Sequence, residues 1–247
     1  MALFQGTVRS LALDMDTRVH VIIPRDYYDA QGQPKHTVDK VLYLLHGLRQ
    51  SGDAWLHLSN AERYARYHGC ALVIPEAQRS WYCDLPDGMR YFTYVTEELP
   101  RLMHDMFRLP DSRESTYIGG LSMGGYGALK CALRHPERYA GALCFSGAFY
   151  TIASPEGRAY CGLGNTPLQP EDDISRLIAS FPADAPKPRL YLACGTEDFL
   201  FQDNLRCRDA LTAAGFDPIW ESWSGGHDWI FWDAALQKAL TLIDTPV

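Results

Sequence analysis

Short apolar runs alternate with longer stretches of helical periodicity along most of the chain. The run at 41–45 is continuously apolar, as expected for a central strand that is buried on both faces. Further strands are predicted at 71–74, 116–118, 142–145, 189–194 and 219–223, and helices at 53–67, 94–107, 123–134, 203–214 and 228–243. This alternation is typical of an α/β fold, with a mostly parallel central sheet and helices on both of its faces.

Two regions depart from this rhythm. Residues 7–14 and 17–24 are predicted to be opening strands that pair antiparallel. The stretch 149–188 is rich in Pro and Gly and has one predicted short helix, at 172–181. We expect residues 1–247 to form a single domain in which 149–188 is an insertion over the strand ends that shapes a pocket. The alternative is that 149–188 is a surface loop without a functional role.

The net charge and the cysteine content indicate which binding partners and which cellular compartment are expected. The net charge is −7 and the pI is about 5.6, so the chain repels phosphate backbones, and neither nucleic acid nor an anionic membrane is an expected partner. No apolar run approaches the length of a membrane span, and the N-terminus lacks a signal-peptide pattern. The seven cysteines form no C-x-x-C pair, which favours buried thiols in a reducing cytoplasm over disulfides.

The pentapeptide GLSMG at 120–124 places Ser122 between a predicted strand and a predicted helix. A serine at such a sharp turn sits in a strained backbone, and its hydroxyl is lifted clear of the sheet. Glycine is needed at 120 and 124 because a Cβ there would clash with adjacent chain. The arrangement predicts that Ser122 is a nucleophile; the alternative is a Gly-rich helix start that is capped by a serine.

A serine hydroxyl needs a base, and an imidazole that titrates near neutrality suits the task. His227 lies in a glycine-rich loop between the last strand and the last helix, where it can reach a serine at the sheet edge. The imidazole in turn needs a carboxylate, and Asp198 follows the end of a predicted strand. Glu197 is the weaker candidate, and Asp228 is better explained as a cap of the final helix.

The loop after the early central strand is the expected source of one oxyanion donor. Our candidates are the backbone N–H groups of Leu48 and Met123, and Gly47 removes side-chain bulk where a substrate approaches. His46 is interpreted as a structural histidine hydrogen-bonded beneath this loop rather than as a base. The chain has no H-E-x-x-H, calcium-loop or phosphate-loop motif, so no metal and no cofactor is expected.

Aromatic residues occur in several of the predicted strand-end loops. These residues are candidates for stacking on a sugar or phenolic ring of a substrate, and ordinary core packing is the alternative for each of them. The candidate substrate-pocket residues are Trp55, Trp81, Tyr82 and Trp229.

Taken together, these motifs resemble the tributyrin esterase family, part of the esterase D-like "putative esterase" group of α/β-hydrolases. The similar blocks span about 18–232 and are LLHG with a downstream tryptophan, WYCDLPDGMRYFTYVTEELP, GLSMGGYGALK, CGTEDFL and GGHDWIFW. The resemblance implies an α/β-hydrolase fold, a cytosolic location and the hydrolysis of short acyl esters, including acetyl groups on sugars. It carries the triad onto Ser122, Asp198 and His227. It also implies that the EELP helix supports the nucleophile region and that a homo-oligomer forms.

The expected function is a serine carboxylesterase that hydrolyses short acetyl- or butyryl-type esters, including acetylated or feruloylated sugars, through an acyl-enzyme. Its partner would be a small-molecule or carbohydrate ester. An acyltransferase with the same triad is an alternative, as is a feruloyl esterase or a thioesterase like S-formylglutathione hydrolase. A non-catalytic binding protein would be expected to lack a triad member, and Ser122, Asp198 and His227 are all present.

Overall fold

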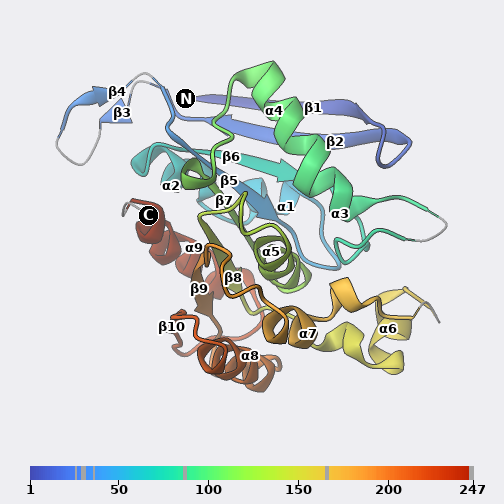
Figure 1. Cartoon of the computed structure of the whole chain (residues 1–247). Helices are drawn as coiled ribbons and strands as arrows, with labels where there is room; N and C mark the ends of the chain where they lie inside the picture. The colour runs from blue at the N-terminus through green and yellow to red at the C-terminus, as the bar shows by residue number, and fades with distance from the viewer. Residues whose placement is uncertain (26, 29–31, 36, 86–87, 165–166, 245–247) are drawn as a thin grey trace.

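The computed structural model describes residues 1–25, 27–28, 32–35, 37–85, 88–164 and 167–244 (Figure 1). Positions 165–166 of the predicted insertion and 245–247 of the predicted domain lie outside the described residues. An eight-stranded sheet forms the centre, in the order β1-β2-β6-β5-β7-β8-β9-β10. From β6 to β10 all neighbours are parallel, whereas β1–β2 and β2–β6 are antiparallel pairs, as predicted for the opening strands.

The strands lie close to their predicted positions, apart from an earlier start of β1 and the small hairpin β3–β4. The strands of the main sheet are β1 (Ala2–Ser10), β2 (Met15–Ile23), β5 (Lys40–Leu45), β6 (Cys70–Pro75), β7 (Thr116–Leu121), β8 (Gly141–Phe145), β9 (Arg189–Ala193) and β10 (Ile219–Glu221). The separate hairpin consists of β3 (Tyr27–Tyr28) and β4 (Pro34–Lys35).

Helices cover both faces of the sheet, which confirms the predicted α/β-hydrolase fold (Figure 1). One face carries α1 (Asp53–His57), α2 (Ala61–Tyr67) and α9 (Trp229–Asp244). The opposite face carries α3 (Tyr91–Thr93), a π-helical turn (Tyr94–Glu98), α4 (Leu99–Phe107), α5 (Met123–Arg134), α7 (Ile174–Ala179) and α8 (Phe201–Ala213), and α6 is Pro155–Cys161.

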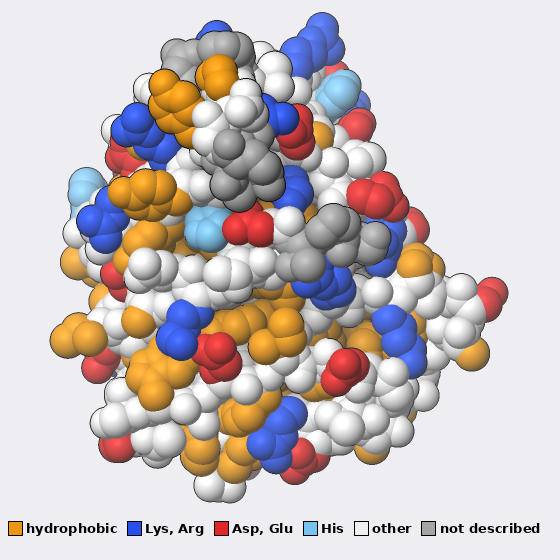
Figure 2. Space-filling view, turned by 90° about the vertical axis from the view of Figure 1, so that its left-hand side faces the viewer, with side chains coloured by type: hydrophobic (Ala, Val, Ile, Leu, Met, Phe, Trp, Pro, Cys, Tyr) orange, Lys and Arg blue, Asp and Glu red, His pale blue; other side chains and the backbone are white. Residues whose placement is uncertain are grey.

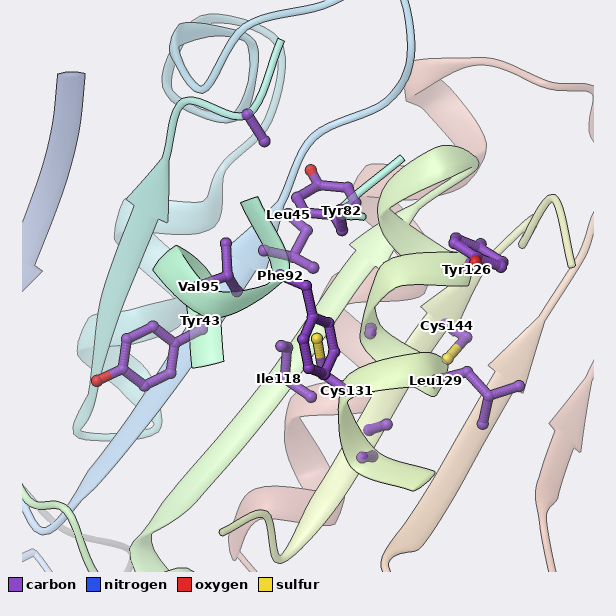
Figure 3. Close-up of a cluster of buried hydrophobic side chains, with 14 of the residues drawn as sticks. Tyr43, Leu45, Tyr82, Phe92, Val95, Ile118, Tyr126, Leu129, Cys131 and Cys144 are labelled. Atoms are coloured by element: carbon purple, nitrogen blue, oxygen red, sulfur yellow. The ribbon is translucent and has the colours of Figure 1, made fainter. Parts of the chain in front are cut away.

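Each face of the sheet buries its own apolar cluster. In the larger cluster, Phe92, Ile118 and Cys144 lie between the sheet and the helices around α5 (Figure 3). All six residues of β7 are buried, as are all five of β8. Strands buried on both faces have no solvated side, which is why these segments are continuous apolar runs in the sequence rather than alternating ones.

The segment predicted as one helix at 94–107 contains a π-helical turn before α4. Pro100 stands in the first turn of α4, where its missing N–H removes one backbone hydrogen bond, and the Thr96 carbonyl accepts instead from Arg138. The neighbouring Glu98 is buried and accepts from Ser10 Oγ at 2.5 Å and from the N–H groups of Leu11 and Ala12. This glutamate therefore anchors the β1–β2 hairpin, and the expectation that the EELP helix supports the nucleophile region stays a prediction.

Two other predicted elements differ from the structure. The helix expected at 53–67 is two helices, since the chain breaks at residues 58–60 before α2. The segment 149–188 contains two α-helices, α6 and α7, where one helix at 172–181 was predicted. This segment is attached to the nucleophile helix: Lys130 Nζ of α5 donates to Asp172 Oδ1 at 2.8 Å, and Tyr126 Oη donates to the Asp172 carbonyl at 2.6 Å.

The net negative charge is not concentrated on the face shown in Figure 2, where basic and acidic side chains are interspersed with apolar ones.

All seven cysteines are buried and free, as the odd count and the spacing indicated. No helix in the described part of the chain combines the length and apolar character that a bilayer crossing requires.

Candidate active site

Ser122 stands at the sharp turn between β7 and α5. Its φ of 55° and ψ of −116° lie outside the regions that L-residues ordinarily adopt. The surrounding chain holds this conformation, because Ser122 N donates to Phe145 O at 2.9 Å and the Ser122 carbonyl accepts from Tyr126 N and Ala148 N. Strain of this kind persists where the fold over-determines it, which is frequent at catalytic positions.

The glycines on either side of the turn allow this close packing. A Cβ on Gly120 would lie 2.6 Å from Leu45 O, and a Cβ on Gly124 would lie 2.5 Å from the same atom. Both distances are well inside van der Waals contact, and the obstacle is backbone that cannot rotate away. The two glycines are therefore required by the approach of α5 to β5, as the sequence pattern predicted.

Replacing Gly124 by alanine is expected to lower the free energy of unfolding by about 2 kcal/mol or more, because the strand and helix must separate to admit the methyl group. Urea unfolding measures this change. Gly6→Ala is the matched control, since a Cβ at Gly6 meets nothing within 4 Å. Equal stability of the two variants would contradict the packing argument.

The structure brings together the three side chains that the sequence analysis named as the triad. His227 Nε2 lies 3.0 Å from Ser122 Oγ, and His227 Nδ1 lies 2.8 Å from Asp198 Oδ2. Asp198 follows β9 and His227 precedes α9, so both come from loops at the same end of the sheet as Ser122. The spacing fits a hydroxyl that donates to one ring nitrogen while the other ring nitrogen donates to a carboxylate.

Asp198 is held in its ionised form. Burial opposes its negative charge, but hydrogen bonds from His227 and from the Leu200 N–H, at 2.8 Å, outweigh burial and lower the pKa of this carboxyl below its ordinary value. The neighbouring Glu197 instead accepts from the Gly225 N–H. Asp228 accepts from the N–H groups of Ile230 and Phe231, which confirms that it caps α9.

The two expected oxyanion donors lie beside the serine. Met123 is the first residue of α5, so its N–H has no acceptor within the helix. Leu48 lines the cavity next to Ser122, in a turn closed by a hydrogen bond from Gln50 N to Gly47 O. Leu48 therefore lies at the cavity and Met123 directly follows the serine, and both remain the candidate oxyanion donors.

His46 lies beneath this turn and is fully buried. The Ala77 N–H donates to its Nε2 at 2.9 Å, so the proton is on Nδ1, which donates to Gly47 O at 2.8 Å. Both ring nitrogens contact backbone groups, and Nε2 also lies 3.2 Å from Glu76 Oε1. The interpretation of His46 as a structural histidine is confirmed.

A cavity of about 290 Å³ opens beside Ser122 and His227. Its walls come from the turns that follow β5, β6, β7 and β8, the segment that contains α6, the loop before α8, and the loop before α9 with the first turn of that helix. The lining residues are Gly47, Leu48, Arg49, Gln50, Trp81, Leu121, Ser122, Ala148, Thr151, Tyr160, Phe199, Leu200, His227 and Trp232.

Three of the four aromatic residues expected in the substrate pocket lie elsewhere. Trp55 is fully buried and donates from Nε1 to Leu45 O at 3.1 Å. Tyr82 is also fully buried, beside Leu45 in the larger core cluster (Figure 3), and donates to His46 O. Trp229 packs edge-on against Trp55, with ring centroids 5.0 Å apart. Only Trp81 lines the cavity, and the other three residues are corrected to packing positions.

Phe199 and Trp232 were missed by the sequence analysis. The ring of Phe199 lies 4.6 Å from that of His227 between centroids and is 78% exposed. Trp232 meets His227 edge-on at 4.9 Å and donates from Nε1 to Ser146 Oγ. One signal was present in the sequence: each residue lies within five positions of a triad candidate.

The comparisons with known proteins agree with this geometry. The family described as "Putative esterase" matches residues 10–243. An acetyl esterase of Caldicellulosiruptor saccharolyticus is 31% identical over 257 residues, covering 97% of each chain. An S-formylglutathione hydrolase of Bos taurus is 30% identical and covers 70% of each chain.

Solved structures give the same result. FphF, a fluorophosphonate-binding serine hydrolase of Staphylococcus aureus solved with substrate bound, has a TM-score of 0.87 at 30% identity and covers 99% of this chain and 98% of its own. The S-formylglutathione hydrolase FrmB of the same organism has a TM-score of 0.85 at 29% identity, with 99% of each chain covered. The chain therefore belongs to the family described as "Putative esterase" and is a serine-dependent carboxylic ester hydrolase with the α/β-hydrolase fold.

Proposed function

We propose that the enzyme hydrolyses short-chain acyl esters, with Ser122 as nucleophile, His227 as general base and Asp198 as the carboxylate that orients the imidazole. The observation that carries the proposal is the continuous contact from Asp198 through His227 to Ser122, at 2.8 Å and 3.0 Å. Hydrogen bonds of this length allow a proton to move from hydroxyl to imidazole as the hydroxyl attacks.

In the first half of the proposed reaction, Ser122 Oγ attacks the ester carbonyl and its proton passes to His227 Nε2. The carbonyl oxygen becomes an oxyanion, and the N–H groups of Leu48 and Met123 are its proposed donors. Asp198, ionised because its pKa is lowered, stabilises the imidazolium that forms. Collapse of the tetrahedral intermediate releases the alcohol, which takes the proton from His227, and leaves the acyl group on Ser122.

In the second half, water replaces the alcohol. His227 accepts a proton from the water as it attacks the acyl-enzyme carbonyl, and the same two N–H groups receive the second oxyanion. Breaking the bond to Ser122 Oγ releases the acid and restores the hydroxyl with the proton held by His227. The opening of the cavity to solvent next to Ser122 supports access of water to this intermediate.

The cavity supports a small acyl group. Its volume of about 290 Å³ lies just below the roughly 300–1,000 Å³ range of ligand pockets. Leu121 and Leu200 are apolar residues in its lining. The similarity to an acetyl esterase over 97% of each chain supports the same substrate class, including acetylated sugars.

A series of p-nitrophenyl esters from acetyl to octanoyl tests the acyl length. We expect kcat/KM to be highest between acetyl and butyryl and at least about tenfold lower for octanoyl, because added methylenes gain contacts only where a pocket encloses them. The leaving group is constant along the series, so intrinsic reactivity changes little. A steady rise of kcat/KM to octanoyl would contradict the proposal, and acetylated xylan and methyl ferulate extend the test to sugar and phenolic esters.

A thioesterase acting on S-formylglutathione is a second candidate, supported by the similarity to hydrolases of that name. Comparing kcat/KM for S-formylglutathione and for p-nitrophenyl acetate distinguishes the two.

The seven free, buried cysteines support a reducing cytoplasmic location, and a homo-oligomer is proposed from the family resemblance. Light scattering of the purified chain measures the oligomeric state.

A further inference from the structure

The cavity beside Ser122 carries a positive charge although the chain as a whole has a net charge of −7. Arg49 is the one lining residue with a permanent charge, and no Asp or Glu is present among the described residues that line the cavity. A cationic group in a concave, partly apolar site attracts anions more strongly than the same group on an open surface. The cavity is therefore suited to a substrate with a negative charge.

The carboxylates in the neighbouring loops have other partners. Glu197 accepts from the Gly225 N–H, Asp228 accepts from the start of α9, and Asp198 accepts from His227 and Leu200. Within the part of the chain that the structure describes, Arg49 has no carboxylate within the 4.0 Å of an ion pair. Its positive charge is therefore not neutralised by the protein.

One neutral group holds the Arg49 guanidinium at the cavity. Arg49 Nη2 donates to Tyr160 Oη at 2.5 Å, and Tyr160, on α6, lines the same cavity and is 61% exposed. Arg79 Nη2 donates to the Tyr160 carbonyl at 3.2 Å, so α6 is also fixed independently of Arg49. A guanidinium has five N–H groups, which leaves Arg49 with free donors in a geometry that matches a carboxylate.

Arg49 is also adjacent in sequence to a residue of the proposed reaction site. It directly follows Leu48, the proposed oxyanion donor, in the turn after β5. An ester that is bound with its carbonyl at this turn would extend its acyl group or its alcohol along the wall that contains Arg49 and Tyr160. We propose that Arg49 is a specificity residue that favours esters carrying a carboxylate over neutral esters of the same shape. This inference rests on the proposed function, because it assigns a substrate class to the same site.

Two matched pairs of esters test the inference. The first pair has the charge on the acyl group: p-nitrophenyl hemisuccinate against p-nitrophenyl 4-methylpentanoate. The second has it on the alcohol: 4-acetoxybenzoate against 4-isopropylphenyl acetate. In each pair an isopropyl group replaces the carboxylate with a similar shape. The measured quantity is the ratio of kcat/KM for the anionic ester to kcat/KM for the neutral ester, after subtraction of the spontaneous hydrolysis rate.

We expect Arg49→Gln to lower this ratio by about 5- to 30-fold in at least one pair, as for the loss of a charge-assisted hydrogen bond. The pair that responds identifies the half of the ester that meets the guanidinium. Comparing each ratio with that of the unaltered enzyme cancels the intrinsic reactivity of the esters. The ratio of the unaltered enzyme should also fall as NaCl is raised, because Arg49 is exposed and its charge is screened.

Arg176→Gln is the matched control, since it removes an exposed arginine of α7 that does not line the cavity. Its ratios should equal those of the unaltered enzyme. Ratios for Arg49→Gln within twofold of the unaltered enzyme in both pairs would overturn the inference. Ser122→Ala separates this failure from failure of the proposed function. If that variant hydrolyses none of the four esters, Ser122 is still the nucleophile, and only the role of Arg49 is overturned.

Discussion

Ser122→Ala is expected to reduce kcat for p-nitrophenyl acetate by roughly 10⁴- to 10⁶-fold. The variant loses the proposed nucleophile while the N–H groups of Leu48 and Met123 remain, so only the residual catalysis by binding and oxyanion contact persists. The alanine methyl group occupies the space of the hydroxymethyl group without its oxygen. Initial rates of p-nitrophenol release measure the effect.

The control for this variant is Ser112→Ala, which removes a hydroxyl from an exposed serine before β7 and should leave kcat unchanged. Urea unfolding of both variants excludes a loss of folded protein as the cause. A Ser122→Ala protein that is folded and retains hydrolysis within tenfold of the unaltered enzyme would contradict the assignment of the nucleophile.

Asp198→Asn is expected to lower kcat by about 10⁴-fold. The carboxylate oxygen 2.8 Å from His227 Nδ1 can only accept, so it keeps the proton on Nδ1 and leaves Nε2 free to accept from Ser122. An asparagine amide can donate to Nδ1, which would move the proton to Nε2 and remove the base. Since the pKa of Asp198 is lowered in the folded protein, the carboxylate remains ionised at neutral pH and below, down to that lowered pKa.

Glu197→Gln is the matched control for Asp198→Asn. It makes the same chemical change one residue earlier, at an exposed carboxylate that accepts from the Gly225 N–H rather than from the imidazole. A glutamine oxygen can still accept that hydrogen bond, so kcat should remain within a few fold of the unaltered enzyme. If the Glu197 variant lost as much activity as the Asp198 variant, the two carboxylates would not have the separate roles proposed for them.

The positions of the triad residues were predictable because the fold constrains them strongly. Continuous apolar runs identify parallel strands, and the carboxyl ends of such strands meet at one edge of the sheet. Ser122 and Asp198 follow such runs, and His227 follows the short edge strand β10, so a correct assignment of strands brings the three residues to one rim. Gly120 and Gly124 added an independent signal, since their packing against Leu45 leaves no room for a Cβ.

The pocket residues were not predictable in the same way, because the direction of a side chain in a loop depends on local dihedral angles. Trp81 and Tyr82 are adjacent, and both have a positive φ, of 54° and 52°. Of this pair, the structure places Trp81 on the cavity and Tyr82 in the core. A residue pattern with period 2 or 3.6 carries no information about such a turn. Trp55, likewise, satisfies its N–H on Leu45 O inside the core.

The segment 149–188 was outside the periodic pattern for a related reason. Its contribution to the cavity depends on Thr151 and Tyr160, which are brought to the site by tertiary contacts such as the buried ion pair of Lys130 with Asp172. That pair joins residues 42 positions apart, on elements whose relative placement is not encoded in either local sequence. Thr151 and Tyr160 line the cavity, and the proposed role of this segment in substrate binding is made specific by the contact of Arg49 with Tyr160.

Covalent labelling tests the central claim most directly. The enzyme is incubated with an alkyl fluorophosphonate, which phosphonylates an activated serine, and its intact mass is then measured before peptide mapping. The account predicts one adduct per chain, located on Ser122, with labelling abolished in Ser122→Ala and greatly slowed in Asp198→Asn. An adduct on another residue, or an active enzyme that forms none, would contradict it.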